Sequence, residues 1–335
     1  MRLRGVVANR FAKRMRIGHW VDRGVFSAVS RGIIMKRVMQ ALINRAPFLS
    51  TLREKVRRYR TFPAGHYYSP VPSKEDVLAY VKLRALPSGQ IPGINLNSQS
   101  QYELLNEYAN FYPDLPFPEK RIPGHRYYYD NGWFSYSDAI FLYSFLRRYQ
   151  PKRIVEVGSG FSSAVMLDTI ESCFPYRPDI TFIEPYPERL LGLLKDGDIA
   201  RVKLIDRKIQ QVPSEVLLAL ESGDLLFIDS SHVVKCGSDL LLLMFEILPR
   251  LQPGVVVHFH DVFYPFDYPT EWLMEGKYWN ENYFLRAFLS YNSEWSIKFF
   301  NTYVHFMYSD LIKEKMPLCA KNSGGSIYIQ REQKG

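Results

Sequence analysis

The second half of the chain alternates between short apolar runs and longer segments with apolar residues at helical spacing. The apolar runs have the length of buried parallel strands, and we predict strands at 153–157, 180–183, 202–205, 225–228, 255–259, 296–300 and 326–329. Helices are predicted between them at 162–172, 187–194, 214–221, 239–250 and 282–291. This alternation is typical of an open, doubly wound α/β sheet. The last two strands form a terminal hairpin, which predicts an antiparallel last strand.

The first 120 residues follow a different pattern. Apolar positions at helical spacing predict two basic amphipathic helices between residues 20 and 60. Residues 61–100 are rich in Pro, Gly and Ser, which indicates an extended connector with one short helix at 74–84. We divide the chain into a basic helical N-terminal arm (1–60), a connector that could act as a lid (61–119) and a main domain (120–335).

The first of these strands ends in an acid and a glycine-rich turn, and then a helix begins. Gly158 and Gly160 let the backbone turn sharply and leave no Cβ in the way of a ligand. The next helix points its free N–H groups at that ligand. A tight turn without a ligand would use the same glycines. Because strand, turn and helix all agree, we interpret this turn as a binding site.

Polar side chains also end the strands that follow. Glu184 comes after the second strand, Asp206 after the third and Asp229 after the fourth, while His260 and Asp261 close the fifth. In an open α/β sheet, ligands bind beyond these carboxyl ends. A carboxylate at Glu184 can accept hydrogen bonds from both hydroxyls of a ribose. We therefore predict that this edge of the sheet binds a nucleoside.

The acid before the first glycine decides between nucleotide cofactors. An NAD-binding fingerprint would need a third glycine where this chain has Ser163. Residues 156–160, Glu-Val-Gly-Ser-Gly, instead resemble the first motif of class I S-adenosylmethionine-dependent methyltransferases. The resemblance implies S-adenosyl-L-methionine as cofactor, with Glu156 facing its methionine portion and Glu184 binding its ribose. Asp206, or the Gln210-Gln211 pair, then takes the adenine position. The cofactor-binding residues implied are Glu156, Gly158, Ser159, Gly160, Glu184, Asp206 and Asp229.

Two later motifs make the resemblance more specific. Residues 228–232, Ile-Asp-Ser-Ser-His, and the pair His260-Asp261 look like a bacterial methyltransferase group with an Ile-Asp-x-x-His motif and a His-Asp pair. The resemblance spans about residues 120–330. It implies a Rossmann-like, mostly parallel seven-stranded sheet with an antiparallel last strand, and it leaves the acceptor undefined.

The motifs after the fourth and fifth strands bring reactive side chains to one place. Because these strands are neighbours in this fold, Asp229, His232, His260 and Asp261 should converge at one pocket mouth. We predict His232, His260 and Asp261 as catalytic residues, with either imidazole removing the proton of a hydroxyl acceptor. The same four side chains could alternatively hold a divalent metal, such as Mg, that acidifies the hydroxyl.

The segment before the first strand is expected to complete this site. A helix at 137–148 should pack on the sheet and bring Tyr129, Asn131 and Asp138 near the glycine turn. Core packing and helix capping are the alternative roles of these three residues. Aromatic side chains such as Phe134 and Tyr264 could wall off water.

The sequence therefore predicts an enzyme that methylates a hydroxyl of a small molecule or a saccharide. Two other classes stay open. A metal-dependent oxygenase or hydroxylase would use His232, His260 and Asp261 as a facial triad. A non-catalytic nucleoside-binding protein would keep the sheet without the chemistry.

The composition indicates the size of the core and the cellular compartment of the protein. The 335 residues are 47% hydrophobic and 15% aromatic, which is enough for a large core with an appendage. Three distant cysteines without a C-x-x-C pair favour a reducing compartment. No apolar run reaches the roughly 18 residues of a membrane span, so we expect a cytoplasmic protein.

The charge of the chain is concentrated at its start. Residues 1–60 hold 16 Lys and Arg against Asp22 and Glu54, a net charge of +14 that leaves −5 on the other residues. Such an arm predicts peripheral contact with the anionic inner face of a membrane, or with a partner protein. No motif for specific nucleic-acid binding accompanies it. A solvated appendage and an organelle transit peptide are the alternatives.

Overall fold

The computed structural model describes residues 62–84 and 86–332. The chain divides into two compact units, one ending at Ser73 and the other beginning at Lys74. The predicted basic arm, residues 1–60, lies outside the described residues. In the first unit, the Phe62 ring stacks on the His66 ring with a centroid separation of 4.6 Å. The Gly65 amide donates a hydrogen bond to the Val71 carbonyl at 2.9 Å. A lid role for this aromatic turn stays a prediction.

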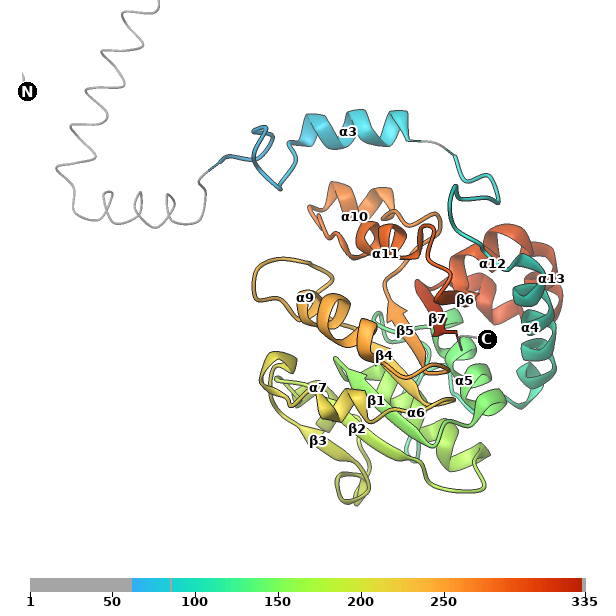
Figure 1. Ribbon diagram of the computed structural model, residues 1–335. Helices are drawn as coiled ribbons and strands as arrows, with labels where there is room; N and C mark the ends of the chain where they lie inside the picture. The colour runs from blue at the N-terminus through green and yellow to red at the C-terminus, as the bar shows by residue number, and fades with distance from the viewer. Residues whose placement is uncertain (1–61, 85, 333–335) are drawn as a thin grey trace, which may run out of the picture. The chain divides into compact units, whose positions relative to one another are not determined.

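The second unit is built on one seven-stranded sheet (Figure 1). Its strands are β1 (Arg153–Val157), β2 (Asp179–Ile183), β3 (Lys203–Ile205), β4 (Leu225–Ile228), β5 (Val256–His260), β6 (Trp295–Phe300) and β7 (Ser326–Arg331). The order across the sheet is β3-β2-β1-β4-β5-β7-β6. Strands β1 to β5 pair in parallel, and β7 runs antiparallel to both β5 and β6. The predicted sheet with its antiparallel last strand is therefore confirmed.

Helices cover the sheet because its central strands are apolar on both faces. Every residue of β4 is buried, and so are the last four of β1. The helices are α3 (Lys74–Leu83), α4 (Ser98–Phe111), α5 (Ser137–Tyr149), α6 (Phe161–Cys173), α7 (Glu188–Leu191), α8 (Glu215–Leu218), α9 (Asp239–Leu242), α10 (Thr270–Met274), α11 (Glu281–Leu289), α12 (Asn301–Met307) and α13 (Ser309–Lys315). Helices α5 and α6 pack together on one side of the sheet, and α9 lies on the other (Figure 1).

One predicted helix has a different form in the structure. The segment predicted as a continuous helix at 239–250 begins as α9, capped by the Ser238 hydroxyl, which accepts a hydrogen bond from the Leu241 amide. It continues as a π-helix (Leu243–Ile247) and a 3₁₀ turn (Leu248–Arg250). Pro249 lacks an amide hydrogen, so no α-helical hydrogen bond can form to the carbonyl of residue 245 inside the π-helical stretch.

The strand register brings the polar strand ends to one edge. Val157, the last residue of β1, lies opposite Ile183 of β2 and Ile228 of β4, and Ile228 lies opposite Phe259 of β5. The residues that follow these positions must therefore meet at the carboxyl edge of the sheet.

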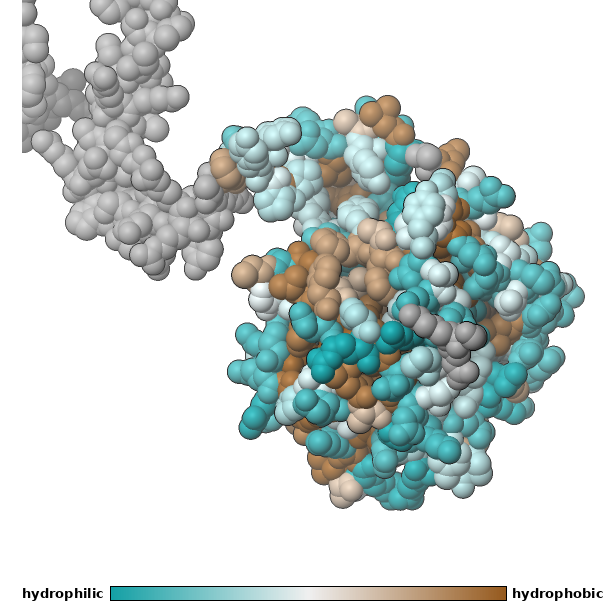
Figure 2. Space-filling view, viewed as in Figure 1, coloured by the Kyte–Doolittle hydropathy of each residue, from teal (hydrophilic) through white to brown (hydrophobic). Residues whose placement is uncertain are grey.

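A second, smaller core lies between α3 and the segment that follows β5. Val77 of α3 packs with Tyr268 and Leu273. Arg84, just after α3, donates to Asp267 Oδ2 at 3.0 Å and to the Tyr268 carbonyl at 3.0 Å. Figure 2 shows apolar side chains gathered over α10 and α11 on this face. In the described part of the chain, no helix has the length and apolar character needed to cross a bilayer.

Candidate active site

The glycine turn after β1 lies directly against the end of β4. Gly158 has a φ of +83°, and a Cβ at this position would stand 1.7 Å from the backbone oxygen of Asp229. The Gly158 amide donates to the Ile183 carbonyl at 3.0 Å. Only glycine fits both this backbone conformation and this close approach, so the turn is fixed between the ends of β2 and β4.

Glu184 is held by the backbone on both of its carboxylate oxygens. Oε2 accepts a hydrogen bond from the Ser159 amide at 3.1 Å, and Oε1 accepts one from the Tyr186 amide at 2.8 Å. The side chain is half-buried. Each carboxylate oxygen can accept a second hydrogen bond, so the group remains able to bind a pair of neighbouring hydroxyls.

Two adjoining cavities open at this edge, and Glu184 lines both. One has a volume of about 460 Å³ and the other about 420 Å³, within the range of small-molecule sites. Both are lined by Gly158, Glu184, Asp229, Ser230 and Ser231. The larger one extends to Ile209 and Gln210, which we call the nucleoside side, and the smaller one to Trp133, Phe134, His232, His260, Asp261 and Trp279, which we call the acceptor side.

Glu156 lies under the turn, and it is absent from the lining of both cavities. Its side chain is fully buried and accepts hydrogen bonds from the Ser162 hydroxyl at 2.6 Å and from the Ser163 hydroxyl. Burial raises the pKa of Glu156 to about 8, against the opposing effect of the serine hydrogen bonds. The structure therefore places this acid where it holds the first turn of α6. Its predicted role toward the methionine portion of the cofactor stays a prediction.

His232 is surrounded by three carboxylates from different parts of the chain. Its Nδ1 lies 2.7 Å from Glu281 Oε2, while Nε2 lies 3.5 Å from Asp229 Oδ1 and 3.4 Å from Asp261 Oδ2. The side chains of His232 and Glu281 are buried. Sequence reasoning missed Glu281, because a single acid in the first turn of a helix also occurs as an ordinary capping charge.

These carboxylates decide the protonation of His232. Burial lowers its pKa, but the hydrogen bond and charge of Glu281, with the charges of Asp229 and Asp261, raise the pKa to about 9. The raised pKa favours the imidazolium form at neutral pH. In that form both ring nitrogens carry a proton, and neither is free to accept another.

His260 faces the same cavity from the end of β5. Its Nε2 lies 3.5 Å from Asp261 Oδ1, and Phe134 packs on its ring at 5.0 Å. The imidazole is buried. Burial lowers the pKa of His260, but the nearby carboxylates, Asp261 foremost, raise it above its ordinary value.

The structure does not support the predicted metal site. The four predicted ligands Asp229, His232, His260 and Asp261 do lie together. Yet within residues 62–84 and 86–332, no group of three or more His, Cys, Asp or Glu side chains is placed to hold a metal ion. The oxygenase alternative, which needs this triad, loses its geometric basis.

Other predicted residues lie outside the cavities. Asp206 lines neither of them, whereas Gln210 lines the nucleoside side and donates to the Gly237 carbonyl at 2.9 Å. Asn131 holds the turn at residues 131–134, because its Oδ1 accepts hydrogen bonds from the amides of residues 133 and 134. Tyr129 and Tyr264 are buried in the aromatic core.

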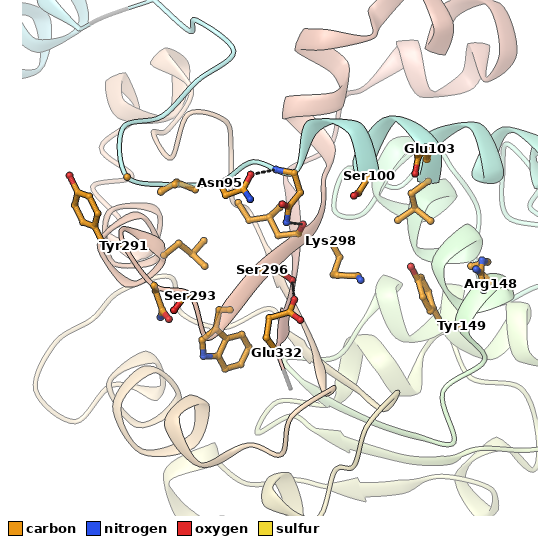
Figure 3. Close-up of a pocket in the computed structure, with 18 of the residues that line it drawn as sticks. Asn95, Ser100, Glu103, Arg148, Tyr149, Tyr291, Ser293, Ser296, Lys298 and Glu332 are labelled. Atoms are coloured by element: carbon orange, nitrogen blue, oxygen red, sulfur yellow. Dashed lines mark hydrogen bonds between the residues drawn. The ribbon is translucent and has the colours of Figure 1, made fainter. Parts of the chain in front are cut away.

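A larger cavity of about 760 Å³ lies elsewhere, between α4 and the edge strand β6 (Figure 3). None of the predicted site residues lines it. Asn97 donates to the Ile297 carbonyl at 3.0 Å, and Ser296 donates to Glu332. These contacts satisfy backbone and side-chain groups along the open edge of the sheet, which gives the polar lining a structural role.

Comparisons with known proteins found a family model, a relative and solved structures that are similar to this chain. A family model for a methyltransferase domain matches residues 155–262. An uncharacterized protein of Archaeoglobus fulgidus is 34% identical over 172 residues, which cover 49% of this chain and 76% of that protein. Among solved structures, a methyltransferase of Podospora anserina aligns over 79% of this chain and 99% of its own, with 17% identity and a TM-score of 0.38. The O-methyltransferase TomG of Streptomyces achromogenes aligns over 77% and 96%, with 15% identity and a TM-score of 0.36.

The assignment rests on two findings together. These are the methyltransferase family model over residues 155–262 and a sheet of order β3-β2-β1-β4-β5-β7-β6 with β7 antiparallel, which is the sheet expected from the class I resemblance. The chain therefore contains a methyltransferase domain with the class I, S-adenosylmethionine-dependent fold.

Proposed function

We propose that the chain binds S-adenosylmethionine across the two adjoining cavities and methylates a hydroxyl group of a small molecule or a saccharide. The observation that carries this proposal is Glu184, a carboxylate held by two backbone amides at the junction of the nucleoside side and the acceptor side. In this arrangement Glu184 binds the ribose hydroxyls, and Gln210 lies beside the base.

The acceptor side supplies the proton chemistry. S-adenosylmethionine supplies an electrophilic methyl group when it is bound. That methyl group would pass from the sulfur to the acceptor oxygen, and S-adenosylhomocysteine would leave. His260 Nε2 faces the cavity beside Asp261 and takes the proton of the acceptor hydroxyl. Asp261, 3.5 Å away, stabilises the imidazolium that forms. The charged His232 holds Asp229 and Asp261 in place rather than acting as a second base.

The walls of the acceptor side favour a flat or partly apolar acceptor. Trp133, Phe134 and Trp279 line the cavity, and the Arg189 guanidinium lies 3.8 Å above the Trp133 ring. Aromatic faces of this kind pack on aryl rings and on the apolar faces of sugars. This supports a phenolic or saccharide hydroxyl as the methylated group.

Calorimetric titration with S-adenosylmethionine tests the proposal. Wild type should bind, and Glu184→Ala should lose two charge-assisted hydrogen bonds, on the order of 2 to 4 kcal/mol or roughly 30- to 1000-fold in affinity. Glu188→Ala, at an exposed glutamate in α7, is the matched control and should bind like wild type. Equal affinity for Glu184→Ala and wild type would show that the ribose is not bound there. No binding to wild type would refute the proposed function.

A further inference from the structure

A chain of buried hydrogen bonds runs behind His260, away from the cavity. His260 Nδ1 lies 3.4 Å from Ser326 Oγ, and the Ser326 hydroxyl donates to Asp138 Oδ1 at 2.6 Å. All three residues are at most 5% exposed. Of the three, only His260 lines the cavity. Asp138 and Ser326 can therefore act on the reaction only through the His260 ring.

The donors around Asp138 determine which way the hydrogen bonds point. Its Oδ1 also accepts hydrogen bonds from Asn301 Nδ2 at 3.0 Å and from the Gly325 amide at 3.0 Å. With three donors converging on this carboxylate oxygen, Asp138 is an acceptor, and it takes the single hydrogen of the Ser326 hydroxyl. The Ser326 oxygen can then only accept from His260, so the ring hydrogen sits on Nδ1 and the lone pair on Nε2.

Two glycines are required for this contact. Gly324 has a φ of +67°, and a Cβ there would stand 2.4 Å from Asp138 Oδ1. A Cβ on Gly325 would stand 2.5 Å from the Phe263 ring. The loop before β7 can approach the Asp138 carboxylate closely only because both residues lack a side chain. The local sequence thus fits a backbone packed around this carboxylate.

Other groups face the His260 ring without fixing its tautomer. On the cavity side, Asp261 lies 3.5 Å from Nε2, and the charges of Asp229 and His232 act from the loop after β4. His258, on the same strand, stacks parallel to the ring with a centroid separation of 6.3 Å, and both of its nitrogens lack a hydrogen-bond partner in the described structure. The Nδ1 contact with Ser326 is the hydrogen bond that the structure gives this ring.

We propose that Asp138 and Ser326 are positioning residues for methyl transfer, which hold His260 in the Nδ1-protonated tautomer so that Nε2 can take the acceptor proton. The proposal rests on the proposed function, because it assigns His260 the part of the base. A buried carboxylate that orients a catalytic imidazole through its far nitrogen is a known device in acyl transfer. Here a serine hydroxyl is inserted between the two.

Nitrogen NMR of the histidine-labelled full chain tests the tautomer without an acceptor. At a pH where His260 is neutral, long-range proton–nitrogen correlation should show hydrogen on Nδ1 in wild type. In Ser326→Ala, the population should shift toward Nε2. Ser144→Ala is the matched control, because Ser144 is equally buried and donates only to the Ile140 carbonyl. An Nε2-protonated ring in wild type, or an unchanged ring in Ser326→Ala, would overturn the proposal.

Kinetics separate a positioning role from a structural one. Ser326→Ala should lower kcat by about 10-fold or more, because a wrong tautomer disables the base, while KM and the affinity for S-adenosylmethionine stay at wild-type values. If Ser326→Ala does not fold, Asp138→Ala, which removes the acceptor of the Ser326 hydroxyl hydrogen, should shift the tautomer in the same direction, because the freed hydroxyl can then donate to His260 Nδ1. Wild type that fails to bind S-adenosylmethionine overturns the proposed function instead. Normal binding with an unchanged tautomer in both variants overturns the positioning role alone.

Discussion

The nucleoside side and the acceptor side share one edge of one sheet, yet they are built differently. The nucleoside side uses backbone turns and a half-buried carboxylate, Glu184, that accepts only from amides. On the acceptor side, His232, His260 and Glu281 are buried and face other ionisable groups. The side that we propose for the nucleoside is therefore built from local turns, whereas the side that we propose for proton transfer is built from ionisable groups that come from distant parts of the chain.

Backbone strain follows the same division. His232 and Asp261 have φ values of +58° and +57°, a region that bulky residues rarely adopt. The His232 loop is held by the start of α11, where the amides of Asn280 and Glu281 donate to the His232 carbonyl at 3.1 and 3.3 Å. On the nucleoside side, the equivalent turn is made by a glycine at little cost.

The largest effect expected is on turnover at the acceptor side. His260→Ala should lower kcat by roughly 10² to 10⁴, the usual contribution of a general base, while the affinity for S-adenosylmethionine is kept. Release of S-adenosylhomocysteine in the presence of a hydroxyl acceptor measures the rate. His305→Ala is the control, because His305 is a half-buried histidine that does not line the cavity. Wild-type turnover in His260→Ala would remove this residue from the chemistry.

Stability should also respond more strongly on the acceptor side. Glu281→Ala leaves the buried His232 without its 2.7 Å partner, and losing one member of a buried pair costs about 3 to 5 kcal/mol. Urea unfolding of wild type and variant measures the change. Glu246→Ala, an exposed acid outside the site, should change the free energy of unfolding by less than about 0.5 kcal/mol. An equally small effect of Glu281→Ala would mean that His232 does not depend on this carboxylate.

The nucleoside side was largely predictable from the sequence because its signals are local. The strand and glycine turn that place Gly158, and the strand that ends at Glu184, each lie within a few consecutive residues. The convergence of Asp229, His232, His260 and Asp261 was also predictable, since parallel neighbours end at one edge. In all these cases the inference needed only strand order and direction.

The partners that hydrogen-bond to His232 and His260 could not be predicted in this way. Glu281 lies 49 residues from His232 in the sequence, and Ser326 lies 66 residues from His260. No periodicity or motif links such positions, because only tertiary packing brings them together. The predicted metal site is not supported by the described residues. The sequence showed its four side chains but not Glu281, the carboxylate that contacts His232.

On the acceptor side, the stability of the fold should depend on pH through His232. The pKa of His232 is raised from 6.5 to about 9 in the folded state, so its charge stabilises the fold fully below pH 6.5. This contribution is lost as the pH rises through about 9. The midpoint of thermal unfolding should therefore fall between pH 7 and pH 9, and His232→Gln should reduce that fall. An identical pH dependence in wild type and His232→Gln would contradict the raised pKa.

The smallest effect on binding is expected at Glu156, which lies below the nucleoside side without lining it. Gln mimics the protonated acid, so Glu156→Gln should bind S-adenosylmethionine within about threefold of wild type, less than 1 kcal/mol. Because burial raises the pKa of Glu156 to about 8, the folded state loses stability as this acid ionises between its ordinary pKa of 4.5 and pH 8. Glu156→Gln cannot ionise, so thermal unfolding scans from pH 5 to pH 9 should not show this loss of stability in the variant. Glu184→Gln is the comparison, since the same change there removes a charged acceptor from the cavity wall. An affinity loss at Glu156 as large as that at Glu184 would mean that both acids contact the cofactor.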